Sequence, residues 1–136
     1  MFKVQTIDHL VLRVATLEPM LNFYLNVLGC TLDRVQEELG LYQIRAGDAL
    51  IDLITIDGKL GRAGGRAAGG QGRNLDHFCL RVEPFDGEKM RAYLIERGIE
   101  VGELASRYGA QGEGLSLYVA DPEGNGVELR GSAGRL

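Results

Sequence analysis

The apolar and polar positions follow the same pattern twice along the chain. Residues 7–14 read Ile-Asp-His-Leu-Val-Leu-Arg-Val, and residues 75–82, which lie 68 positions further on, read Leu-Asp-His-Phe-Cys-Leu-Arg-Val. Five of these eight positions are identical, and the alternation of apolar and polar side chains is typical of a half-buried strand. The sequence therefore predicts a duplicated unit.

A helical pattern and several strand-like runs follow each copy. In the first half, apolar residues spaced by three and four predict a helix over 17–28, with Thr16 as its cap and Gly29 at its end. In the second half, a helix begins after Asp86 and stops at Gly98. Each half then reads as a strand, a helix and about three strands. The strand-like runs are 41–45, 49–56, 115–120 and 126–130, with a hairpin turn over 121–126.

Residues 58–73 separate the two halves. Seven of these 16 residues are glycine, and no Gly-Lys-Ser/Thr sequence follows, so a flexible linker is favoured over a loop that grips an anion. The chain is thus interpreted as one domain over 1–136, with module one at 7–57 and module two at 75–131. A single half would expose an apolar sheet face, so we expect the halves to pair within the chain or across a dimer.

Composition and charge exclude several classes of protein. The 136 residues are 45% hydrophobic and 25% charged, which is typical of one soluble globular unit. No apolar run approaches the roughly 18 residues of a membrane span, and two cysteines make no disulfide framework, so a cytoplasmic protein is expected. Outside 58–73 the chain holds 11 basic against 19 acidic residues, which disfavours nucleic acid as a partner.

The candidate chemistry lies on the repeated strands. His9 and His77, the only histidines, occupy equivalent positions, although a satisfied core histidine is the common alternative. Asp52 lies in the apolar run 49–54, where an ionised carboxylate needs a compensating cation or hydrogen-bond donor. Glu128 holds the matching place in the second half, where pairing with Arg130 or solvent exposure is the alternative. Two imidazoles and two carboxylates suit one divalent ion, Zn, Ni, Mn, Co or Fe.

These residues together resemble the vicinal oxygen chelate superfamily, which includes glyoxalase I, extradiol dioxygenases and bleomycin-binding proteins. The resemblance implies an α+β fold in which two βαβββ modules pair into a curled mixed sheet around a cavity. It also implies that His9, Asp52, His77 and Glu128 hold the metal. Aspartate is a departure from the usual Glu or Gln, so a water-bridged contact from Asp52 is an alternative. The motifs that carry the resemblance are 7–12, the helix end at 22–29, 75–77 and 121–129.

The segment 106–114 resembles a loop near the cavity mouth of small glyoxalase-like proteins. This resemblance implies that Arg107 and Tyr108 contact the substrate, with Arg107 pairing to an anionic group. A solvent-exposed turn is the alternative, because the glycines alone explain a loop.

Three functions are compatible with these residues. The first is a metal-dependent glyoxalase-type lyase or isomerase that transfers a proton through a metal-bound enediolate of a small vicinal-oxygen substrate. Glu128 would be its base, and Asp52 its second ligand or partner acid. The second is an Fe(II)-dependent extradiol-type dioxygenase that uses His9, His77 and Glu128. The third is a non-catalytic protein that binds an antibiotic or metabolite. The family resemblance also predicts a homodimer.

Overall fold

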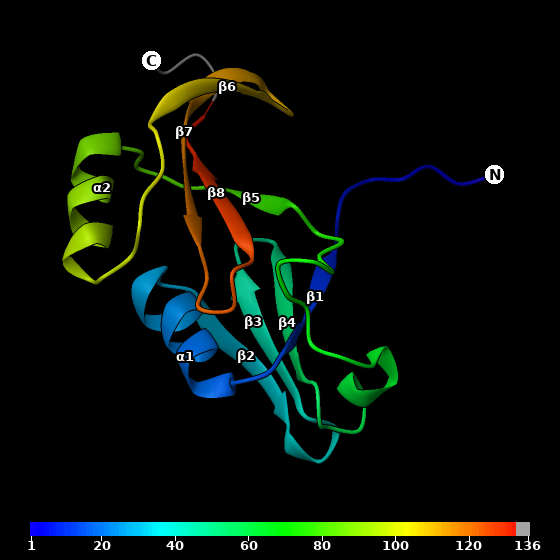
Figure 1. Ribbon diagram of the computed structural model, residues 1–136. Coiled ribbons are helices and arrows are strands. Elements are labelled where there is room, and N and C mark those ends of the chain that lie inside the picture. Colours follow the sequence, from blue (N-terminus) through cyan, green and yellow to red (C-terminus); the bar gives the residue numbers. More distant parts are fainter. Residues whose placement is uncertain (133–136) are drawn as a thin grey trace. The chain divides into compact units, whose positions relative to one another are not determined.

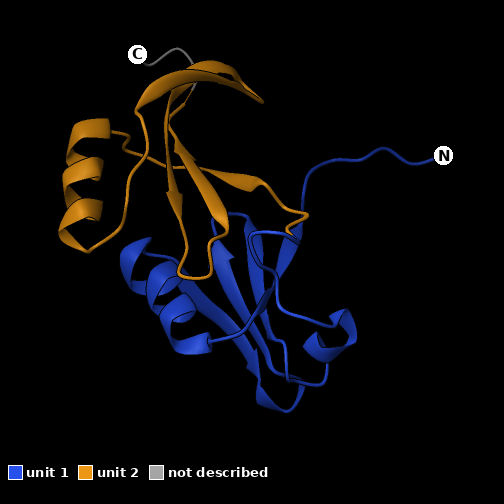
Figure 2. Cartoon of the chain, in the orientation of Figure 1, with its two compact units in different colours: residues 1–72 blue, residues 73–136 orange. Residues whose placement is uncertain are grey.

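Among the residues that the structure describes, eight strands pair into two four-stranded sheets, one in each half of the chain. The computed structural model describes residues 1–132. It divides into two compact units, the first over residues 1–72 and the second from residue 73 onward (Figure 2). Each unit is described separately below.

Unit 1 contains one sheet and a helical segment (Figure 1). Strand β1 runs parallel to β4, and β4, β3 and β2 then follow in antiparallel order. The helical segment connects β1 to β2. The strands are β1 (His9–Val14), β2 (Thr31–Gln36), β3 (Leu41–Ala46) and β4 (Ala49–Thr55), and the helices are α1 (Leu17–Leu21), π-helical η1 (Asn22–Val27) and the short 3₁₀ turns η2 (Glu37–Leu39) and η3 (Gly61–Gly64).

Unit 2 repeats this topology. Its strand order is β5-β8-β7-β6, with β5 parallel to β8 and the other pairs antiparallel. The elements are β5 (His77–Arg81), α2 (Gly87–Glu96), β6 (Ala105–Gly109), β7 (Gly112–Ala120) and β8 (Gly126–Arg130). The predicted α+β class with two βαβββ modules is confirmed.

One face of each sheet is apolar, because side chains alternate across a strand. In β1, Leu12 and Val14 are buried, whereas His9 and Val11 on the other face are exposed. The face that carries the histidine is therefore the one left for chemistry in each sheet. The buried apolar residues are Leu12, Val14, Met20, Phe23, Tyr24, Ile44, Ile51 and Leu53 in unit 1, and Leu94, Leu117, Val119, Val127 and Leu129 in unit 2.

The two helical segments agree with the predicted positions but differ in form. The helix predicted over 17–28 is α-helical only as far as Leu21 and continues as a π-helix. Thr16 stands at its N-cap with an extended backbone, and its side chain makes no cap hydrogen bond. At α2, by contrast, the Asp86 carboxylate accepts a hydrogen bond from the Lys89 backbone N–H at 3.2 Å. Both segments are followed by a glycine with φ of 78°, Gly29 and Gly98, as the sequence predicted.

The prediction of a loop over 106–114 is wrong. Strand β6 and the start of β7 form a hairpin there, in which Arg107 pairs with Gly114 and Tyr108 with Glu113. The resemblance and the glycines of the segment indicated a loop, but the backbone hydrogen bonds that pair two strands do not require a side chain.

The first part of the predicted flexible linker is held against β1. The Arg13 guanidinium donates from Nε to the Gly61 carbonyl at 2.9 Å, from Nη1 to the Arg66 carbonyl at 3.0 Å, and from Nη2 to the Gly65 carbonyl. A Cβ built on Gly64 would overlap Arg13 Nε. A backbone carbonyl can accept a hydrogen bond whatever the side chain of its residue. The amino-acid composition of the segment therefore could not predict this contact.

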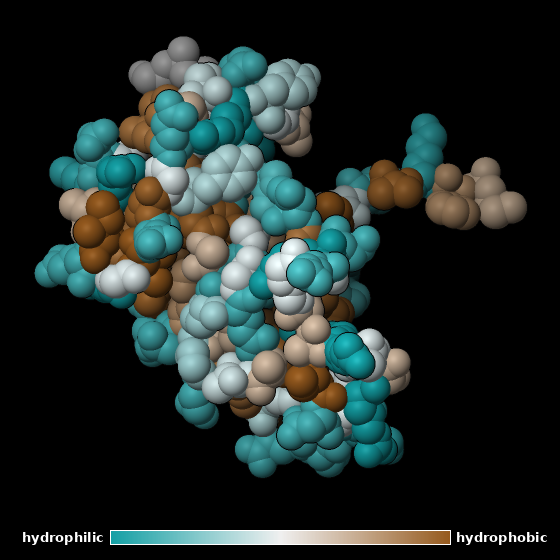
Figure 3. All heavy atoms as spheres, viewed as in Figure 1, coloured by the Kyte–Doolittle hydropathy of each residue, from teal (hydrophilic) through white to brown (hydrophobic). Residues whose placement is uncertain are grey.

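Residues 1–8 form an arm that precedes β1 and carries exposed apolar side chains at Phe2, Val4 and Ile7. Figure 1 shows this arm extending away from β1, and Figure 3 shows hydrophobic residues along it. Among the described residues, no helix has the length and apolar character needed to cross a membrane.

Candidate functional site

Each histidine begins a strand and is held by the aspartate before it. His9 Nδ1 lies 2.7 Å from Asp8 Oδ1, and His77 Nδ1 lies 2.6 Å from Asp76 Oδ1. A carboxylate that accepts from Nδ1–H assigns the tautomer in which Nε2 carries the lone pair, and this is the usual support for a metal-binding histidine. The hydrogen bond that His9 donates to Asp8 raises the pKa of His9, against a smaller opposing effect of desolvation.

The strand register places one carboxylate beside each histidine strand. Val11 pairs with Asp52 across β1 and β4, and Cys79 pairs with Glu128 across β5 and β8. Val11 and Cys79 each lie two positions after a histidine, so each carboxylate is on the same sheet face as its histidine. Asp52 and Glu128 therefore hold equivalent positions in the two modules.

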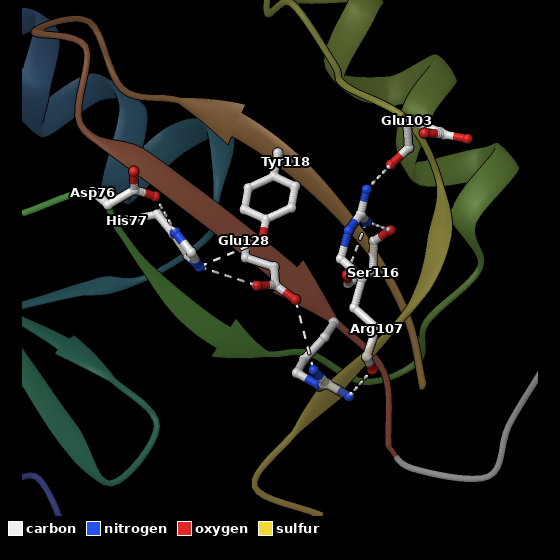
Figure 4. A network of polar contacts seen from close by, with 8 residues as sticks. Asp76, His77, Glu103, Arg107, Ser116, Tyr118 and Glu128 are labelled. Carbon is white, nitrogen blue, oxygen red and sulfur yellow. Dashed lines mark hydrogen bonds and ion pairs between the residues drawn. The ribbon is translucent and has the colours of Figure 1, made fainter. Parts of the chain in front are cut away.

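In unit 2 the histidine and the carboxylate are in direct contact (Figure 4). His77 Nε2 lies 3.3 Å from Glu128 Oε1 and 3.4 Å from the Tyr118 hydroxyl. The Tyr118 ring meets the His77 ring edge to face, with 5.0 Å between the ring centroids. Burial, followed by the hydrogen bond to Glu128, raises the pKa of the Tyr118 phenol.

Glu128 is buried, and one of its oxygens is poorly satisfied. The residue is 5% exposed, and its Oε2 has no hydrogen-bond partner among the described residues. The nearest cation is Arg130, whose Nη1 lies 3.6 Å from Oε2, beyond hydrogen-bond distance. The pairing with Arg130 considered above is thus present as an ion contact, whereas solvent exposure is not. A buried acceptor without a donor is costly, so this oxygen is suited to bind a cation or a proton.

In unit 1 the carboxylate has a neutral partner. Asp52 is also 5% exposed, and Gln43 Nε2 lies 3.3 Å from its Oδ1 and 3.2 Å from its Oδ2. Gln43 is opposite Asp52 across β3 and β4, just as Tyr118 is opposite Glu128 across β7 and β8. An amide therefore stabilises the first carboxylate, and a phenol stands at the equivalent place in the second half.

The donor set of each unit fits a divalent ion, with one imidazole and one carboxylate. His77 and Glu128 are brought together directly, while His9 and Asp52 share one face of neighbouring strands. Within residues 1–132, no group of three or more His, Cys, Asp or Glu side chains is close enough to hold a metal ion. A complete four-residue site thus requires a ligand pair from each unit, and it remains a prediction.

The two residues predicted to contact substrate lie on opposite faces of β6. The Arg107 guanidinium donates to the Ser116 carbonyl at 2.7 Å, the Ser116 hydroxyl at 3.1 Å and the Glu103 carbonyl at 3.0 Å, and it stacks over the Tyr118 ring at 4.7 Å. Tyr108 is 79% exposed on the other face. Several donors of Arg107 are therefore already bound within the unit.

Asp8, Asp76, Gln43 and Tyr118 were not among the predicted site residues. The two aspartates had a signal, because Asp-His occurs in both copies of the repeat. Gln43 and Tyr118 had none, since only the strand register brings them to the carboxylates.

Comparison with known families decides the relationship that the repeat suggested. The model of the Glyoxalase/Bleomycin resistance protein/Dioxygenase superfamily matches residues 6–129. The chain belongs to this superfamily. This assignment agrees with the resemblance based on the repeated Asp-His strands.

Three solved structures illustrate the range of the superfamily. An integron cassette protein from V. cholerae is 26% identical, with a TM-score of 0.76, over 96% of this chain and 98% of that one. A lactoylglutathione lyase from Agrobacterium tumefaciens is 19% identical, with a TM-score of 0.68, over 94% of both chains. An antibiotic binding protein from Streptomyces is 19% identical, with a TM-score of 0.70, over 98% of this chain and 100% of that one. The fold therefore occurs in both a lyase and a binding protein.

Proposed function

We propose that this superfamily member is a divalent-metal-dependent lyase or isomerase of glyoxalase type, acting on a small substrate with two adjacent oxygens. The observation that carries the proposal is the buried Oε2 of Glu128, which lacks a donor, beside a histidine whose Nδ1 is held by Asp76. His9, Asp52, His77 and Glu128 would hold the ion. When bound, the ion would polarise the substrate oxygens as a Lewis acid and so acidify the neighbouring C–H.

The two carboxylates have different roles in this proposal. Both oxygens of Asp52 accept from Gln43, so its negative charge is already stabilised and it serves as a ligand. Glu128 Oε2 is buried and has no hydrogen-bond donor among the described residues, so this oxygen is available to accept the proton from carbon. It then returns the proton to the neighbouring carbon, which completes an isomerisation.

Glu128→Gln tests the role of the base. The amide retains the shape of the side chain and one oxygen but cannot accept a proton, so we expect the metal to be retained and turnover to fall by about 10²–10⁴-fold. Elemental analysis measures the metal. Proton-exchange NMR in deuterated water, on a panel of 2-oxo and 2-hydroxy compounds, measures proton transfer at carbon.

A matched control is Glu96→Gln, which removes the same charge from an exposed position on α2. This variant should exchange protons at the wild-type rate. Wild-type exchange by Glu128→Gln would contradict the assignment of the base.

Oxygen uptake with a catechol and Fe(II) would replace the lyase proposal with the dioxygenase alternative.

A second candidate is a binding protein without catalysis. The observation that favours it is the family match itself, because the superfamily also includes bleomycin resistance proteins. The antibiotic binding protein from Streptomyces has the same fold. Far less than one metal ion per chain after purification, together with no metal affinity by calorimetry, would favour this candidate.

A further inference from the structure

The repeat-equivalent arginines Arg13 and Arg81 are used differently. Each lies four positions after the histidine on its strand, and therefore on the same sheet face as that histidine. Arg13 donates to three backbone carbonyls of residues 61–66. The Arg81 guanidinium is exposed and makes no hydrogen bond or ion pair with any other residue of the described chain. Unit 2 thus presents an uncommitted guanidinium on the face of His77 and Glu128.

A second arginine stands directly beside Arg81. The register pairs Arg81 with Arg130 across β5 and β8, on strands about 4.8 Å apart. At the equivalent place in unit 1, Arg13 pairs with the apolar Ile54. Two neighbouring positive charges repel each other, and Arg130 is 4% exposed, so water screens its charge weakly. An anion next to Arg81 would relieve this repulsion.

The whole histidine face of unit 2 has an excess of positive charge. Among the described strand residues of this face, Arg81, Arg130 and Arg107 on β5, β8 and β6 stand against the carboxylate of Glu128, and the Asp76 carboxylate is bound to His77 Nδ1. The complete chain, by contrast, has a formal charge of −4. Arg107 and Arg130 donate to backbone carbonyls of the unit, which leaves Arg81 as the group with free donors.

We infer that Arg81 binds an anionic group, a carboxylate or a phosphate, of the small molecule that occupies this face. A guanidinium matches both anions through paired N–H donors. Arg81 lies two positions beyond Cys79, the residue that pairs with Glu128. The Cα of Arg81 is therefore roughly 6–7 Å further along the strand than the Cα of Cys79. This inference rests on the proposed function, because it assumes that the reacting part of the substrate lies at Glu128 and its anionic group at Arg81. It narrows the substrate class to vicinal-oxygen compounds that carry an anionic group a few bonds away.

Titration of the full chain with inorganic phosphate, after treatment with EDTA, tests the inference. Removing metals ensures that any binding comes from the protein. We expect saturable shifts of the amide resonances of β5 and β8 in ¹H–¹⁵N NMR, at an ionic strength held constant with chloride. In Arg81→Gln the affinity should fall by about tenfold or more, because charge-assisted hydrogen bonds are lost. Arg81→Lys should retain part of it.

Arg34→Gln is the matched control, because Arg34 is an exposed arginine on β2 of the other unit. This variant should bind phosphate as the wild type does. A parallel titration with malonate distinguishes the source of the anion: tighter malonate binding identifies a carboxylate ligand, and tighter phosphate binding a phosphorylated one. Equal affinity of wild type and Arg81→Gln for both anions, or shifts that do not saturate, would overturn the inference.

The metal content of Arg81→Gln separates this inference from the proposed function. We expect it to equal that of the wild type, since Arg81 is not among the proposed ligands. If the wild type binds no metal yet phosphate binding depends on Arg81, the lyase proposal fails and the anion site stands. If metal and proton exchange are found but Arg81→Gln binds both anions normally, the anion site fails alone.

Discussion

The two site carboxylates are equally buried but differently compensated. A neutral amide, Gln43, lies within hydrogen-bond distance of both oxygens of Asp52. Glu128 instead has His77 beside Oε1, a hydrogen bond with the Tyr118 phenol, and the Arg130 guanidinium 3.6 Å from Oε2. A buried acceptor without a hydrogen-bond donor is costly. Both oxygens of Asp52 therefore have a donor, whereas Glu128 Oε2 can still accept one from a ligand.

Asp8→Asn should lower the pKa of His9 toward its ordinary value near 6.5, because the hydrogen bond from His9 to the Asp8 carboxylate is the main cause of the raised value. A raised folded-state pKa stabilises the fold fully below about pH 6.5, and this contribution is lost as the pH rises through the raised pKa. The imidazole Cε1 proton resonances report the titration directly, since the chain has only two histidines.

Asp33→Asn is the control for this titration, because Asp33 is an acid on β2 that pairs with Arg45. It should leave the His9 curve unchanged. The same midpoint for His9 in Asp8→Asn and wild type would show that Asp8 does not set this pKa. Metal binding should also weaken below the raised pKa, where His9 is protonated and cannot act as a ligand.

Among the individual residues, the sequence identifies site residues that occupy equivalent positions in the two repeats. It does not identify site residues that reach the carboxylates only through the strand register. His9, His77, Asp52 and Glu128 stand at repeat-equivalent positions, and their equivalence is confirmed by the strand pairing. The meeting of all four at one ion stays a prediction. Tyr118 reaches Glu128 only across the β7–β8 ladder, and nothing in the local sequence of β7 indicates which residue it will face.

At the scale of elements, the edge strands β2 and β6 were the hardest to place. Five of the six positions of β2 are exposed, so its sequence lacks the alternation that predicts a strand. The inner strands β4 and β8 have buried apolar residues, and their predicted ranges agree with the structure to within one residue. Hydrophobic burial leaves a pattern in sequence, whereas pairing by backbone alone does not.

Gly64→Ala should destabilise unit 1 more than Gly69→Ala. A Cβ at Gly64 would overlap the Arg13 side chain, which three carbonyls hold in place, whereas a Cβ at Gly69 meets nothing within 4 Å. We expect the free energy of unfolding to fall by about 1–3 kcal/mol for Gly64→Ala and to change by less than about 0.5 kcal/mol for Gly69→Ala. Urea denaturation measures both.

Limited trypsin digestion gives a local check of the same contact. Cleavage after Arg62 and Arg66 should be faster in Gly64→Ala than in Gly69→Ala, because the segment is released from Arg13. Equal stability and equal cleavage in the two variants would mean that the Arg13 contacts do not hold this segment.

At the scale of the whole molecule, the proposed metal site would take its ligands from both modules. If each unit supplies two ligands, Zn²⁺ or Ni²⁺ at about 100 times its dissociation constant should raise the free energy of unfolding by about 2.7 kcal/mol. His77→Ala should abolish most of this effect. Thermal unfolding with and without the ion measures it.

Cys79→Ser is the control for the metal experiment. Burial raises the pKa of the Cys79 thiol to about 11, so the thiol is protonated at neutral pH and is a poor ligand. This variant should keep the full stabilisation by metal. Equal stabilisation of His77→Ala and wild type would place the ion elsewhere in the chain.

The repeat predicted both modules and their βαβββ order, because each copy carries its own apolar face. It does not specify whether the modules pair within one chain or across a homodimer, since either arrangement covers the same apolar surface. That choice depends on contacts between residues that are far apart in the sequence or on separate chains, and the hydrophobic periodicity of the sequence does not predict such contacts. Size-exclusion chromatography with light scattering measures the oligomeric state.

The hydrogen bonds from Arg13 to backbone carbonyls also make part of the segment 61–66 suitable for labelling. Three of its N–H groups recognise carbonyls, so the side chains at residues 62, 63 and 66 do not take part in the contact. A cysteine introduced at Ala63 would carry a fluorophore there without replacing any donor or acceptor of the Arg13 hydrogen bonds. Such a dye would report when the segment leaves β1, and with it any rearrangement that ligands cause beside the histidine face.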